Sequence, residues 1–133
     1  MKNYRIAILF VLVGFSSFGQ TSSEDLERGN AKFKLKDYKG AIIDFNKSIA
    51  LNSNNVDAYY SRGTAKFQLR DFNGAISDYT KAIAITPKKG NIYFVRGLAK
   101  IELNQDAEGC KDVEIACSLG YRLAREKKAQ LCN

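Results

Sequence analysis

The sequence predicts an all-α protein, a solenoid of three helix-turn-helix repeats closed by one further helix. Three observations lead to this fold class. The block at 28–32 (RGNAK) returns at 62–66 (RGTAK) and at 96–100 (RGLAK), and both offsets, 62 − 28 and 96 − 62, are 34 residues. Apolar residues within each unit follow a helical period, and turn-forming residues separate the helices. A fixed interval of this length is typical of stacked units, whose repeated surface usually forms a binding groove.

Residues 1–19 have the three-part layout of a secretory signal peptide. Residues 1–5 are basic, 6–15 are apolar (IAILFVLVGF), and small residues follow, with Ser17 and Gly19 at −3 and −1 of the expected cleavage site. The apolar run is shorter than the ~20 residues that span a bilayer, which disfavours the alternative of an uncleaved anchor. We therefore expect an exported protein, periplasmic or secreted, with no stable membrane insertion after the signal is removed.

Length, composition and charge are those of one ordinary globular domain. The chain has 133 residues, of which 45% are hydrophobic and 26% charged, so disorder is not expected. Without residues 1–19 the formal net charge falls from +7 to +5, because this segment contributes Lys2 and Arg5 and no acid. The remaining surplus is spread along the chain, and export disfavours nucleic acid as a partner.

Each repeat is expected to contain two helices joined by a turn. In the second repeat we expect one helix over about 57–70, a turn at 71–74 (DFNG) and a second helix from about 74 to 85. The Asn-Gly pair favours the turn, and Pro87 prevents the second helix from continuing. The first two repeats are identical at 14 of 34 positions. The repeats run over 22–55, 56–89 and 90–123.

One position of the first helices is always glycine, although a glycine inside a helix costs ~1 kcal/mol relative to alanine. This pattern predicts that the paired helices cross closely there, because a side chain would clash. The glycines and the small residues expected to face them are Gly29, Gly63 and Gly97 against Ala41, Ala75 and Gly109.

No arrangement of residues points to catalysis, so we expect a protein that is not an enzyme. The chain has no His and no Cys-x-x-Cys pair, which disfavours a metal site, a cofactor and thiol redox chemistry. A repeated acid and a repeated base could suggest hydrolysis by paired carboxylates, but a catalytic site rarely recurs in every unit of a solenoid. We interpret them as structural ion pairs between helices. The residues are Arg28, Arg62 and Arg96 with Asp44, Asp78 and Asp112.

The segment 121–131 is expected to form a capping helix, because a stack of repeats leaves its last face open. Gly120 ends the preceding helix. If the two helices run antiparallel through this turn, Cys110 faces the neighbourhood of residue 130, close to Cys132. We therefore expect a Cys110–Cys132 disulfide that ties the cap to the last repeat. Cys117 aligns with core positions of the other repeats and is expected to be a buried free thiol.

The second repeat carries aromatic, small and proline residues at fixed spacing, namely Tyr59, Gly63, Ala75, Tyr79, Ala82 and Pro87. This pattern resembles the tetratricopeptide repeat. The third repeat matches at Tyr93, Gly97 and Ala116 and departs with Gly109 and Val113. The resemblance implies a right-handed helix-turn-helix solenoid over 22–121. The Cys-containing end is similar to that of exported bacterial members of the family.

By the same resemblance, the first helices line a concave groove that binds protein or peptide partners. Some members of the family grip a C-terminal carboxylate through basic groove residues. Apolar residues stand at the matching positions here, which favours an apolar helix or an extended peptide instead. We therefore expect an exported adaptor. The alternatives are a self-associating, homo-oligomeric subunit of an envelope complex and a thiol-redox protein. The expected groove residues are Leu26, Asn30, Phe33, Tyr60, Thr64, Phe67, Phe94 and Leu98.

Overall fold

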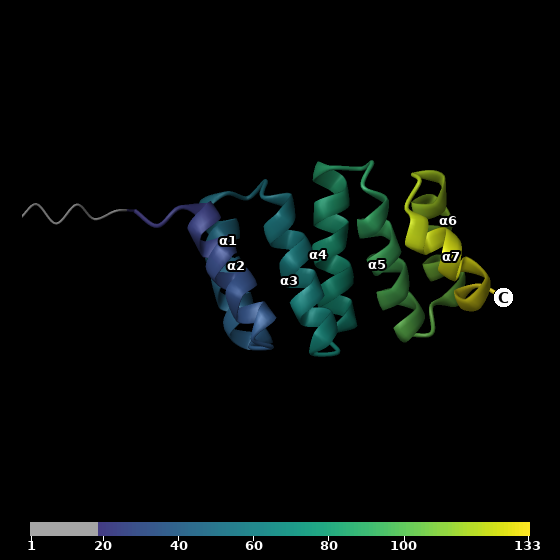
Figure 1. The fold of residues 1–133 in the computed structure, drawn as a ribbon, viewed down its shortest axis with the longest axis horizontal. Coiled ribbons are helices and arrows are strands. Elements are labelled where there is room, and N and C mark those ends of the chain that lie inside the picture. The colour runs from purple at the N-terminus through teal and green to yellow at the C-terminus, as the bar shows by residue number, and fades with distance from the viewer. Residues whose placement is uncertain (1–18) are drawn as a thin grey trace, which may run out of the picture.

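The computed structural model describes residues 19–133, and the proposed signal peptide therefore lies almost wholly outside the described residues. Every regular element in the described part is an α-helix, so the all-α solenoid is confirmed. The helices follow one another along a single axis from the N-terminal to the C-terminal end (Figure 1). Their bounds are α1 Ser22–Lys34, α2 Tyr38–Leu51, α3 Val56–Gln68, α4 Phe72–Ile85, α5 Gly90–Glu102, α6 Asp106–Ser118 and α7 Arg122–Leu131.

The turn inside the second repeat lies a few residues earlier than the sequence pattern predicts. Helix α4 begins at Phe72, and Asp71 is its N-cap, whose side chain accepts a hydrogen bond of 2.9 Å from the Gly74 amide. The prediction of a turn over 71–74 is therefore wrong, because the Asn-Gly pair lies in the first helical turn. A Cβ atom at position 74 would collide with the capping carboxylate of Asp71, which explains the glycine.

The turns themselves are made by a residue in the left-handed backbone region. Lys36, Arg70 and Asn104 have φ angles of 62°, 63° and 59°, and Gly120 has the corresponding place after α6 with φ 83°. At Gly120 the amide donates to the Cys117 carbonyl (3.0 Å), and the next amide, of Tyr121, donates to the Ala116 carbonyl (3.0 Å). This pair of bonds is the Schellman end of a helix, which satisfies carbonyls left open by the last turn.

Close helix crossing at the three repeated glycines is confirmed, and so is the facing pair Gly97 and Gly109, but the residues that face Gly29 and Gly63 differ from the prediction. A Cβ atom at Gly29 would lie 2.5 Å from the Phe45 ring, and one at Gly63 would lie 2.8 Å from the Tyr79 ring. The aromatic ring one turn beyond Ala41 or Ala75 fills the space, so these alanines are not the facing residues. In the third repeat Val113 replaces the ring, and a Cβ at Gly97 would lie 2.7 Å from the carbonyl oxygen of Gly109.

The repeated acids and bases form ion pairs between paired helices, as the sequence predicts. Arg62 places Nε 2.9 Å from Oδ2 and Nη2 2.6 Å from Oδ1 of Asp78, which is buried, and Lys66 Nζ lies 3.0 Å from Oδ2. These hydrogen bonds outweigh burial and raise the pKa of Arg62. Arg62 also donates to Asn46 of the preceding repeat at 2.9 Å. The buried carboxylate of Asp78 is thus paired at both oxygens, and the second repeat is linked to the first.

The C-terminal helix is joined to the last repeat as the antiparallel argument predicts. The Sγ atoms of Cys110 and Cys132 lie 2.14 Å apart, with their Cα atoms 5.6 Å apart. Cys117 is the free cysteine, but it is half-buried, so the prediction of a buried thiol is wrong. The reason is that α7 buries only Ala124 completely, and Cys117 lies at the margin of the cluster around it. None of the helices in residues 19–133 is both long and apolar enough to cross a bilayer.

Candidate functional site

A pocket lies between the first helices of the first two repeats. Asn30 and Phe33 of α1 line it on one side, and Tyr60, Ser61 and Thr64 of α3 on the other. Four of these five are predicted groove residues, so the structure brings predicted residues of two repeats to one pocket. The cavity measures about 180 Å³. This volume suits one side chain of a partner better than a whole small molecule, whose sites usually measure ~300–1,000 Å³.

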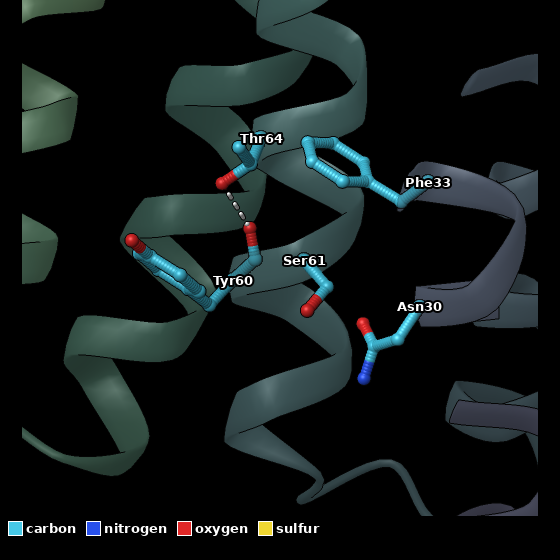
Figure 2. Close-up of a pocket in the computed structure, with 5 residues that line it drawn as sticks. All are labelled: Asn30, Phe33, Tyr60, Ser61 and Thr64. Atoms are coloured by element: carbon cyan, nitrogen blue, oxygen red, sulfur yellow. Dashed lines mark hydrogen bonds between the residues drawn. The ribbon is translucent and has the colours of Figure 1, made fainter. Parts of the chain in front are cut away.

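Figure 2 shows how the side chains lie around this pocket. Phe33 points from α1 toward α3, and Asn30 and Ser61 face each other across the gap. The Tyr60 ring lies on the side of α3 that faces away from α1. Tyr60 therefore borders the pocket with the part of the residue nearest the α3 backbone. Ser61 was not among the predicted residues. The sequence offered one hint, because Ser61 directly follows the predicted residue Tyr60. Its position opposite Asn30 is visible only in the structure.

Aromatic contacts behind the pocket hold its residues in place. The Phe33 and Tyr38 ring centroids are 5.1 Å apart in an edge-on arrangement, and those of Tyr60 and Tyr79 are 6.0 Å apart. Thr64 Oγ1 donates to the Tyr60 carbonyl at 2.9 Å and lies 3.2 Å from the Tyr79 hydroxyl. Burial raises the pKa of Tyr79, so this hydroxyl stays protonated and available for hydrogen bonding. The lining residues of the pocket are therefore backed by packed, uncharged aromatic side chains.

No residue that lines this pocket carries a charge. The polar atoms available are the Asn30 amide and the hydroxyls of Ser61 and Thr64. A buried carboxylate of a partner would find no cation here and would lose its hydration. The arrangement can therefore receive an apolar side chain, with Asn30 and Ser61 placed to hydrogen-bond a peptide backbone at the rim. Among residues 19–133 no group of three or more His, Cys, Asp or Glu side chains could hold a metal ion.

The other predicted groove residues lie outside this pocket. Leu26 packs against the cluster of Ala41 and Phe45. Phe67 packs on Phe72, with ring centroids 5.1 Å apart. Phe94 is only 4% exposed, so the prediction that it lies open on the groove surface is wrong. Its ring lies under the cap, because the loop before α7 brings Tyr121 to a centroid distance of 5.5 Å.

A second hollow of about 310 Å³ lies between α5 and α7. Phe94 and Leu98, the two predicted groove residues of the third repeat, form its α5 side. The α7 side contributes one cation, Lys127, beside apolar and amide side chains. Six of the eight predicted groove residues therefore line two separate hollows, one between the first two repeats and one beside the cap, while Leu26 and Phe67 pack against other core residues. The α7 residues of this hollow are Leu123, Lys127, Gln130 and Leu131.

Comparisons with known proteins identify the family. A family model described as a TPR repeat matches residues 29–70, and one described as a tetratricopeptide repeat matches 56–89. The Arabidopsis OM64 TPR domain is 32% identical, with 83% of this chain and 93% of that chain covered at a TM-score of 0.78. The chain therefore belongs to the tetratricopeptide repeat family. No curated protein is significantly similar in sequence.

Two further solved structures resemble the chain closely in fold. The first TPR of Spaghetti (RPAP3), bound to the HSP90 peptide SRMEEVD, is 28% identical, with 83% of this chain and 89% of that chain covered at a TM-score of 0.79. The first TPR domain of human RPAP3 is also 28% identical, with 83% and 88% covered at a TM-score of 0.78. The fold is thus one on which a peptide is seen bound in a relative.

Proposed function

We propose that the protein is an exported adaptor that binds a protein or peptide partner through the groove formed by α1 and α3. The observation that carries this proposal is the uncharged pocket lined by Asn30, Phe33, Tyr60, Ser61 and Thr64. It combines an aromatic wall with hydrogen-bonding groups at the rim, which is the composition that recognises a side chain within a peptide. The peptide bound by a relative supports the class of partner.

The chemistry of the pocket favours an apolar anchor residue in the partner. The peptide SRMEEVD bound by the relative carries two glutamates and a terminal aspartate. The pocket here has no cation to match such charges, so we expect binding of an extended or helical segment with an apolar side chain at its centre. Export is consistent with the Cys110–Cys132 bond, because disulfides persist outside the reducing cytoplasm.

The function is tested by selecting peptides from a random displayed library on the purified protein and measuring the affinity of each selected peptide. Asn30→Lys places a charge in the pocket without removing any core side chain, and we expect it to weaken binding about ten-fold or more. Ile43→Ala on α2 is the matched control, because Ile43 is 56% exposed and does not line the pocket. It should leave the affinity unchanged.

Two results would contradict the proposal. One is a set of selected peptides that bind wild type and Asn30→Lys equally, which would place recognition elsewhere on the surface. The other is preferential selection of acidic C-termini like that of SRMEEVD, which would contradict the apolar anchor. For export, the N-terminus of protein isolated from the expressing bacterium should be Gln20. Protein that begins at Met1 and is found in the cytoplasmic fraction would contradict export.

A further inference from the structure

The cap helix α7 covers the groove surface of the third repeat. Phe94 takes the place in α5 that Tyr60 takes in α3, since 94 − 60 equals the repeat length of 34. Tyr60 is half-buried, whereas Phe94 is 4% exposed and packs in one cluster with Tyr121, Ala124 and Leu131. Without α7, the groove surface would therefore continue over α5.

The packing of α7 on the rest of the molecule is slight. The helix has 10 residues, Ala124 is its only buried one, and Leu123 remains 39% exposed. Its ion pair to α6, between Lys128 and Glu114 at 3.1 Å, joins two exposed side chains and contributes little. Helices of this length are marginal on their own in water. The Cys110–Cys132 bond is thus the strongest tether of α7.

This bond is also open to attack. Both cysteines line a surface hollow and are half-buried. Thiol–disulfide exchange requires that a thiolate reach one of the two sulfurs. Asp106 borders the hollow and disfavours an anionic reagent, but a protein dithiol approaching from solvent has access. The hollow is lined by Asp106, Ala107, Cys110, Leu131, Cys132 and Asn133.

We propose that the Cys110–Cys132 disulfide is a redox latch that holds α7 over the groove, and that reduction by a dithiol releases α7 and exposes Phe94 and Leu98 to the partner. A reductant thiolate attacks one sulfur and forms a mixed disulfide, while the bond between the two protein sulfurs breaks and the other sulfur leaves as a thiolate that takes up a proton. The reductant's second thiol then displaces the protein thiolate, so the reductant leaves as a disulfide and the protein gains two electrons and two protons as two thiols. The regulatory meaning of this latch rests on the proposed peptide-binding function.

The free thiol of Cys117 reports on the latch. Cys117 packs at the margin of the cluster that α7 covers, and it is the only thiol in the oxidised protein and in the Cys110→Ser/Cys132→Ser variant. We expect a maleimide to label Cys117 about ten-fold faster or more in the variant, because local opening of α7 controls access. Equal labelling rates in the two proteins would overturn the proposal.

Hydrogen exchange separates release of α7 from general destabilisation. On adding dithiothreitol, the amides of 122–131 and of α5 around Phe94 should exchange faster, while those of α1 to α4 should not change. The serine double variant should show the faster pattern without the reductant and should not respond to it. Faster exchange over all seven helices, or unchanged exchange in α7, would each contradict a local latch.

These outcomes are distinct from failure of the proposed function, because neither readout needs a partner. If α7 is released but no peptide binds the α1–α3 pocket, the adaptor proposal fails and the latch stands. If peptides bind that pocket and α7 keeps its protection after reduction, the latch fails alone. If the adaptor and the latch are both correct, the reduced protein should select longer peptides than the oxidised protein does. Leu98→Lys should weaken the binding of these longer peptides, and the affinity of the shorter peptides, which contact only the α1–α3 pocket, should not change.

Discussion

At the scale of single residues, two side-chain choices decide how the helices of a repeat pair. Glycine on the first helix makes room for an aromatic ring on the second, as Gly63 does for the buried Tyr79. A buried aspartate on the second helix is held by an arginine and a lysine one turn apart on the first, as Asp78 is by Arg62 and Lys66. The 34-residue interval predicts the glycines and the arginine–aspartate pairs, but not the facing rings or the lysines.

Gly63→Ala should destabilise the protein by about 1–3 kcal/mol, although alanine is the better helix former. The added methyl group would lie 2.8 Å from the Tyr79 ring, and that ring is 1% exposed and cannot move aside. Urea unfolding followed by circular dichroism measures the change. Gln68→Ala, at an exposed position of α3, is the control and should change the stability by a few tenths of a kcal/mol. A stabilised Gly63→Ala protein would refute the close crossing.

Protonation of Asp44 should weaken the first repeat in acid. Burial opposes ionisation of this carboxyl, but hydrogen bonds from Lys32 and Arg28 outweigh it and hold its pKa below 3.8. A lowered folded-state pKa gives stability that is present above the unfolded pKa and lost as the pH falls through the folded pKa. We therefore expect unfolding free energy to fall below about pH 4. Asp44→Asn should be less stable at pH 7 and show a shallower acid slope, whereas Glu27→Gln should follow wild type.

At the scale of elements, the helices could be predicted from the sequence and the turns could not be placed. Apolar periodicity identifies α3 and α4, but the Asn-Gly pair at 73–74 suggested a turn that the structure replaces with the first turn of α4. The actual turn residues are Lys36, Arg70 and Asn104. Lys36 and Arg70 carry no sequence signal because long side chains rarely adopt positive φ, whereas asparagine is enriched there. In the first two repeats, the capping residues Asp37 and Asp71 that follow the turn residue were the better guide.

Lys36→Gly should stabilise the protein by about 0.5–1 kcal/mol. Lys36 is exposed with a φ angle of 62°, a backbone conformation that costs a non-glycine residue about 1 kcal/mol. The gain is partly offset by the greater freedom of glycine in the unfolded chain. Thermal unfolding measures the change. Lys47→Gly in the exposed middle of α2 is the matched control and should destabilise by ~1 kcal/mol. A loss of stability in both variants would contradict the strain at position 36.

At the scale of the whole molecule, the repeats differ at their two ends. The second and third repeats are each linked to the preceding one by an arginine, Arg62 to Asn46 and Arg96 to Thr80. The C-terminal end is closed by α7 and the Cys110–Cys132 bond. Cys110 and Cys132 are 22 residues apart in the sequence. In the chain-entropy account, a disulfide that closes a loop of this length stabilises the fold by about 3 kcal/mol. This closure explains why Phe94 is buried in the third repeat, whereas Tyr60 at the equivalent position of the second is half-buried.

The site could be predicted only in part. The repeat interval placed Asn30, Phe33, Tyr60 and Thr64 on neighbouring first helices, and the structure brings them to one pocket. Phe94 follows the same interval, yet it is buried, because its exposure depends on a helix outside the repeat pattern. The repeat interval predicts the same surroundings for equivalent residues of each repeat. At the ends of the stack a neighbouring repeat is missing or replaced by a cap, so equivalent residues there have different surroundings.

The adaptor account is tested most directly by mapping backbone amide chemical shifts on titration with a selected apolar peptide. The account predicts that the largest shifts fall on Asn30, Phe33, Ser61 and Thr64, that they saturate together, and that Asn30→Lys abolishes them. Shifts gathered instead around the Arg62–Asp78 ion pair or on α2, with the pocket amides unmoved, would contradict it.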